Sequence, residues 1–102
     1  MREAERTDDG RWIVVDGRRW RAEDPSLTPD ASARLRSHLG RARAAVRNAS
    51  SDAERDAARE RVQLAKEGLG ERGERWWELS EHERAARAED RLATLDGLAP
   101  PA

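Results

Sequence analysis

Two stretches of the sequence carry apolar residues at the same spacing of four, three and four positions. The first contains Leu35, Leu39, Ala42 and Val46, and the second contains Ala58, Val62, Ala65 and Leu69. This spacing places each set along one face of an α-helix. Because only a short connection separates the two stretches, the sequence predicts an antiparallel helical hairpin.

Capping residues set the expected limits of these helices. Thr28 precedes a proline and is a suitable N-cap, so the first helix is expected from Pro29 to Asn48. Ser51 begins a capping-box pattern, so the second helix is expected from Asp52 to Leu69. Gly70 follows as a C-cap that ends the second helix.

A third helix is predicted near the C-terminus. Ser80 and Glu83 form another capping-box pattern, and the helix should end near Gly97. Its weak apolar stripe consists of Ala85, Ala88, Leu92 and Leu95. Before it, Trp76 and Trp77 are expected to point in opposite directions in an extended segment. One of them should close the helical hairpin, and the other is either a core contact or an exposed anchor.

The stretch WIVVDGRRWR, residues 12–21, predicts a β-hairpin with a two-residue type I′ turn at Asp16 and Gly17. The expected opposite pairs are Val15–Arg18, Val14–Arg19, Ile13–Trp20 and Trp12–Arg21. We expect the face with Ile13 and Trp20 to be buried, so Trp20 should lie in the core.

Large aliphatic side chains are scarce, which limits the core. The 102 residues include 14 Leu, Ile and Val residues together and no Phe. We expect an α+β, mostly helical domain, in which the N-terminal β-hairpin packs on the antiparallel helical hairpin and a short third helix follows. Residues 1–10 are expected to be flexible, residues 11–79 to form the core domain, and residues 80–102 to form the C-terminal helix and tail.

Charge is distributed unevenly along the chain. Residues 11–49 carry a net charge of +5 and residues 50–102 a net charge of −4, although the whole chain is close to neutral at −1. The halves could therefore attract each other, within one chain or across a dimer, or the basic half could bind a polyanion.

These patterns leave two function hypotheses open. The leading one is a non-enzymatic protein-interaction or structural module, with a homodimer as one form, whose candidate surface is Trp12, Arg19, Arg21, Leu64, Trp76 and Trp77. The alternative is a nucleic-acid-binding module that uses the basic hairpin and a helical stripe of Arg36, Arg43 and Arg47. In that case the arginines would contact phosphates and Trp12 would stack on bases.

Catalytic and metal-binding patterns do not emerge from the sequence. The two histidines, His38 and His82, lie on different predicted helices, and no arrangement supplies a nucleophile, a base and an orienting group. Cysteine is absent, which excludes thiolate metal sites. We expect no enzymatic activity, no metal and no cofactor. We also expect a cytoplasmic protein with no membrane association, because no apolar run reaches about 18 residues.

The string DDGRWIVVDGRRWRAEDP, followed by SLTP and later by GERGERWW, resembles a group of small actinobacterial proteins often labelled "biopolymer transporter Tol". The resemblance covers roughly Asp8 to Glu78 and depends on the hairpin and on the Gly/Trp motif. A subunit of a Tol transporter is expected to carry a membrane anchor, and the sequence shows no such segment. The resemblance therefore implies little about chemistry.

Overall fold

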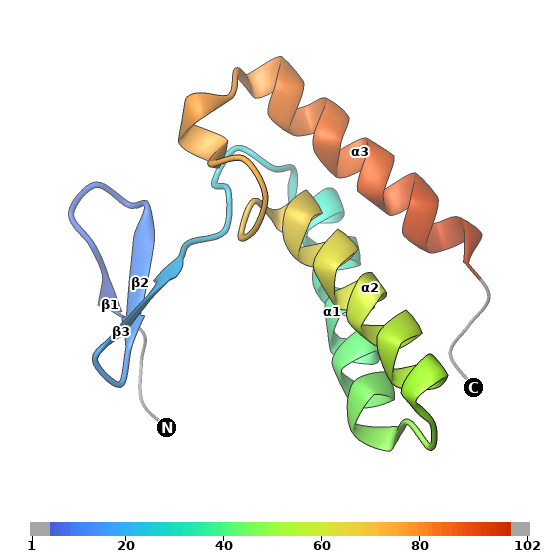
Figure 1. Cartoon of the computed structure of the whole chain (residues 1–102). Coiled ribbons are helices and arrows are strands. Elements are labelled where there is room, and N and C mark those ends of the chain that lie inside the picture. Colours follow the sequence, from blue (N-terminus) through green and yellow to red (C-terminus); the bar gives the residue numbers. More distant parts are fainter. Residues whose placement is uncertain (1–4, 99–102) are drawn as a thin grey trace.

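The computed structural model describes residues 5–98 and shows an antiparallel sheet followed by a helical region (Figure 1). The elements are β1 (Glu5–Arg6), β2 (Trp12–Val15), β3 (Arg18–Arg21), α1 (Pro29–Asn48), α2 (Asp52–Leu69), the short 3-10 helix η1 (Trp76–Glu78) and α3 (Glu81–Gly97). This confirms the predicted α+β, mostly helical fold.

The predicted limits of α1 and α2 and the predicted start of α3 are confirmed. They could be predicted because each cap acts within one turn of its helix. The Thr28 hydroxyl accepts a hydrogen bond from a backbone amide in the first turn of α1. Gly70 ends α2 in the left-handed conformation with φ of 86°. Ser80 and Glu83 form the complete capping box of α3.

The start of α2 differs from the prediction in one detail. The Ser51 hydroxyl accepts a hydrogen bond from the Glu54 amide, as expected. The Glu54 carboxylate, however, accepts from the amide of Ser50 at 2.9 Å, one residue before the cap. The acid therefore fixes the connection between the two helices rather than closing a capping box.

The core lies where α3 covers the antiparallel pair of α1 and α2 (Figure 1). Its buried cluster is Leu35, Leu39, Ala65, Leu69, Ala88, Leu92 and Leu95. Close approach of the helices depends on Gly68 of α2, because a Cβ atom there would lie 2.7 Å from a methyl carbon of Leu35. Thus α3 belongs to the same core as the helical hairpin.

The predicted register of the β-hairpin is confirmed at every pair, from Trp12 opposite Arg21 to Val15 opposite Arg18. Asp16 and Gly17 both have positive φ, at 51° and 79°, as a type I′ turn requires. The sheet also contains β1, which pairs antiparallel with β2. No strand was predicted at these two residues.

The expectation that Trp20 lies in the core is wrong. Its side chain is 44% exposed, and the face of the sheet that turns toward the helical region is the other one, with Trp12 and Arg21. Alternation fixes which residues share a face, but the neighbouring segment decides which face is covered. Here the segment after α2 supplies Trp77, whose ring contacts Trp12, and the Gly73 carbonyl, which accepts a hydrogen bond from Arg21.

The sheet lies to one side of the helices, beside the segment between α2 and α3 (Figure 1), and contacts that segment through Trp77 and Gly73. The ring nitrogen of Trp76 donates a hydrogen bond to the Ala22 carbonyl at 3.0 Å. The amide of Asp24 donates to the Leu69 carbonyl at 2.8 Å, so the strand exit is tied to the end of α2. The buried Asp24 carboxylate also pairs with Arg84 of α3 at 3.5 Å.

The prediction of an extended segment at Trp76 and Trp77 is wrong. These residues form the 3-10 helix η1. The two rings meet edge to face, with centroids 5.2 Å apart. Trp76 is buried, whereas Trp77 is half-buried. The segment thus presents both tryptophans to the joint between sheet and helices instead of exposing one of them.

Candidate functional site

An open groove of about 540 Å³ lies between α1 and α2. Its floor is apolar and consists of Val46 from α1 and Val62 from α2, both half-buried. No described residue of α3 lines it. The groove therefore runs along a side of the helix pair that α3 does not cover.

Arginines flank this floor from three segments. Arg43 and Arg47 come from α1, Arg59 comes from α2, and Arg72 comes from the turn after α2. The two arginines of α1 are four positions apart, so they lie one above the other on the helix surface. The antiparallel pairing of the helices brings Arg59 to the opposite wall.

Three of these arginines lack a direct polar partner. In the part of the chain that the structure describes, Arg43, Arg47 and Arg59 make neither an ion pair nor a hydrogen bond. All three are exposed at the rim. The groove therefore carries a concentration of positive charge above an apolar floor.

The pKa of a neighbouring lysine reports the same excess of positive charge. Burial lowers the pKa of Lys66, and the nearby charges of Arg72 and Arg43 lower it further. Glu71, close to them, is the compensating acid, but burial raises the pKa of its carboxyl group. The positive field is thus only partly neutralised at this end of the groove.

Arg36 belongs to the same predicted stripe as Arg43 and Arg47 but is placed differently. Its Nε donates to the Glu23 carboxylate at 2.7 Å, and the same carboxylate accepts a hydrogen bond from Ser32 at 2.6 Å. The strand exit brings Glu23 over the first part of α1, so Arg36 is neutralised. The unpaired charge begins further along the helix.

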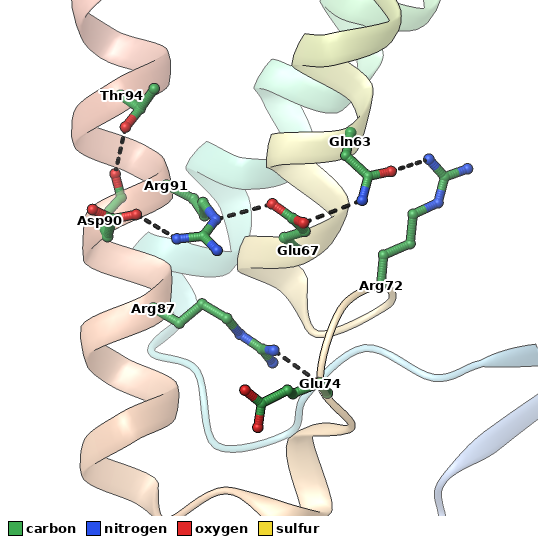
Figure 2. A network of polar contacts seen from close by, with 8 residues as sticks. All are labelled: Gln63, Glu67, Arg72, Glu74, Arg87, Asp90, Arg91 and Thr94. Atoms are coloured by element: carbon green, nitrogen blue, oxygen red, sulfur yellow. Dashed lines mark hydrogen bonds and ion pairs between the residues drawn. The ribbon is translucent and has the colours of Figure 1, made fainter.

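The position of Arg72 is fixed by a chain of hydrogen bonds that reaches α3 (Figure 2). Its guanidinium donates to the side-chain oxygen of Gln63 at 2.8 Å, and the amide nitrogen of Gln63 donates to Glu67 at 3.1 Å. Glu67 in turn accepts from Nε of Arg91 in α3 at 3.1 Å. The end of the groove is therefore held in place by the covered side of the molecule.

Three residues of the predicted interaction surface, Trp12, Arg21 and Trp77, form a joint within the molecule. The rings of Trp12 and Trp77 meet with centroids 5.6 Å apart, and Arg21 donates to the Gly73 carbonyl at 2.7 Å. The guanidinium of Arg19 stacks over Trp12 at 4.5 Å. These groups are occupied in holding the sheet to the helices.

Leu64 also has an internal role, because it packs as a half-buried side chain against the core cluster. The aromatic ring that does remain open is Trp20, with the guanidinium of Arg18 stacked 4.6 Å from its centroid. The structure therefore brings Arg43 and Arg47 into one site, and it disperses the other predicted contacts.

Sequence reasoning missed Arg59 and Arg72. For Arg59 a signal existed: the matching apolar spacings of the two helices imply which positions face each other across the pair. Arg72 lies in a glycine-rich turn, and its direction depends on its contact with Gln63. No local pattern encodes that contact.

Other chemistry has little support among the described residues. His38 contacts Asp96 at 2.7 Å and Arg41 at 3.2 Å, so it belongs to a polar cluster between α1 and α3. No group of three or more His, Asp or Glu residues within residues 5–98 could hold a metal ion. The arrangement of the groove is suited to binding an anionic group beside an apolar one.

None of the helices in this part of the chain combines the length and the apolar character needed to cross a membrane. No protein-family model matches the chain, and it shows no significant similarity to a curated protein or to a solved structure.

Proposed function

We propose that this protein is a non-enzymatic protein-interaction module that binds an acidic segment of a partner protein in the groove between α1 and α2. The observation that carries the proposal is the set of three unpaired arginines, Arg43, Arg47 and Arg59, around the apolar floor of Val46 and Val62. Charges left without partners on two facing helices are complementary to carboxylates on a binding partner. Arginine is also the cation that is enriched at protein interfaces.

A protein partner is favoured over a nucleic acid by the composition of the site. Binding of single strands combines arginines with aromatic rings on which bases stack. The groove has an aliphatic floor, and none of the described residues that line it is aromatic. Trp12, the ring predicted to stack on bases, is engaged by Trp77 and Arg19 instead.

The proposal is tested with a fluorescently labelled poly-glutamate peptide, titrated with the purified full-length chain and followed by anisotropy. We expect saturable binding at about 0.1 M salt that weakens at about 1 M, because the Debye length falls from about 10 to about 3 Å. The double variant Arg43→Ala/Arg59→Ala should bind about tenfold more weakly, since exposed ion pairs contribute up to about 1 kcal/mol each.

Arg41→Ala is the matched control for charge. Arg41 is an exposed arginine of α1 that lies outside the groove, where it contacts Ser37 and His38. Its loss should leave the peptide affinity unchanged. Absence of peptide binding, or an equal loss in the control, would overturn the proposal. Tighter binding of a mixed-sequence DNA oligonucleotide, lost in the same double variant, would favour a nucleic acid as the partner.

A further inference from the structure

We infer that the partner segment bound in the groove is an amphipathic α-helix, with one apolar row between two flanks of carboxylates. This inference rests on the proposed function and specifies the form of the ligand. It is carried by the spacing of the groove walls, by the shape of the floor, and by the way in which α3 already binds the other side of the same helix pair.

The walls of the groove repeat at the spacing of a helical turn. Arg43 and Arg47 are four residues apart on α1, and Arg59 and Gln63 are four residues apart on α2. Four residues correspond to a rise of about 6 Å along a helix. Carboxylates four residues apart on an incoming helix have the same spacing, so such a helix can match a wall over successive turns.

The floor accepts an apolar row and offers nothing to a strand. Val46 and Val62 contribute branched aliphatic groups from the two helices, and the space above them is open. Backbone hydrogen-bonding groups within the two helices are already satisfied, so an extended peptide would gain no ladder of hydrogen bonds there. Side chains from successive turns of a helix, in contrast, can interdigitate with those of α1 and α2.

The molecule contains an internal precedent in α3. This helix inserts an apolar row of Ala88, Leu92 and Leu95 beside the α1/α2 pair. Asp96, next to that row, forms an ion pair with Arg34 and a hydrogen bond with His38 of α1. Thus the side of α1 that faces α3 already has a cation, Arg34, neutralised by an amphipathic helix with a flanking carboxylate. The groove presents the same kinds of group without such a helix.

Arg72 gives this site a fixed end. Because Gln63, Glu67 and Arg91 hold its guanidinium in place, little side-chain freedom is lost when it binds. An ordered guanidinium binds a carboxylate at a defined position of the ligand better than the mobile carboxylates of a disordered acidic chain. The site therefore distinguishes an ordered acidic helix from a disordered acidic chain.

The experiment compares two peptides of identical composition. The first places Leu at helical spacing with Glu at four-residue intervals on both flanks, and Ala elsewhere. The second contains the same residues in a scrambled order that has no apolar face. Both are titrated into the full-length protein by calorimetry, and circular dichroism at 222 nm records helix formed on mixing. We expect at least tenfold tighter binding of the first peptide, with a gain of helical signal.

Two double variants separate the contributions of floor and walls. Val46→Ala/Val62→Ala should reduce the affinity for the amphipathic peptide severalfold and leave that of the scrambled peptide unchanged. Arg43→Ala/Arg59→Ala should weaken both peptides. Thermal unfolding of each variant shows whether it is folded. If the valine variant fails to fold, the comparison of the two peptides on the unaltered protein still decides the question.

Each result has a distinct meaning. Equal affinity of the two peptides, or binding without a gain of helical signal, would overturn the inference of a bound helix and leave the proposed function standing. Failure of both peptides while poly-glutamate still binds would likewise overturn only the inference, whereas failure of poly-glutamate to bind would overturn the proposed function. Preferential binding of the amphipathic peptide that falls in the valine variant, together with weaker binding of both peptides by the arginine variant, would support the inference.

Discussion

On the side of α1 that faces α3, Arg34 and His38 both meet Asp96, and across the same interface Arg91 meets Glu67. On the groove side, Arg43, Arg47 and Arg59 form no ion pair within the described residues. Both sides present cations and aliphatic groups on the same pair of helices. They differ in whether a third helix supplies the carboxylates.

This difference shows how a chain that is nearly neutral overall can hold a locally basic site. The basic N-terminal half and the acidic C-terminal half do attract each other, but only where α3 reaches α1. Beyond that contact, Arg43, Arg47 and Arg59 form no ion pair within the described residues. A balanced total charge therefore says little about the field at one groove.

The largest expected effect is a loss of unfolding free energy on the covered side, which is the face of the α1/α2 pair that packs against α3. Leu35 is fully buried among the three helices, and Leu35→Ala would remove three side-chain carbons and leave a cavity. We expect the free energy of unfolding to fall by about 2–5 kcal/mol, the range for such substitutions in cores. Chemical denaturation measures this loss. Val46→Ala in the groove floor is the control and should cost much less, and an equal loss would contradict the comparison.

Much of the covered side could be predicted from the sequence, because its determinants are local. Thr28, Ser80 and Gly70 act as caps within one turn of their helices, and the Asp16–Gly17 turn alone sets the register of the β-hairpin. The apolar spacing then identifies the buried faces of the helices. Each of these patterns involves residues that are close in the chain.

The rest could not be predicted because it depends on contacts between distant segments. Burial of one face of the sheet is decided by Trp77, which is more than fifty residues from Trp20. The arginine stripe was visible, but its division into a neutralised and a free part depends on where Glu23 lies. Periodicity gives the faces of each element, and only the packing shows what each face meets.

An intermediate effect on the free energy of unfolding is expected when an arginine is replaced by alanine, once at the interface with α3 and once at the groove. Arg91→Ala breaks a half-buried pair with Glu67 at 3.1 Å and should reduce the free energy of unfolding by about 1 kcal/mol. Arg59→Ala removes a rim cation that makes no ion pair and should change it by less than about 0.5 kcal/mol. Parallel denaturation curves measure both. A larger loss of unfolding free energy for Arg59→Ala would mean that the groove arginines stabilise the fold, which would contradict the contrast between the two sides.

The smallest effect is a dependence on pH that belongs to the covered side alone. A hydrogen bond from His38, together with the charge of Arg34, holds the pKa of Asp96 below its usual value. A carboxyl group whose pKa is lowered by folding stabilises the protein above its unfolded pKa, and this contribution disappears as the pH falls through the folded pKa. The stability difference between the unaltered protein and Asp96→Asn should therefore be present at neutral pH and shrink below about pH 4. Thermal unfolding across this range measures it, with Arg47→Ala as the groove-side control that should show a difference independent of pH. If the Asp96→Asn difference also stayed constant with pH, the contact between α1 and α3 would not be the source of the lowered pKa, and the contrast between the two sides would have to rest on packing alone.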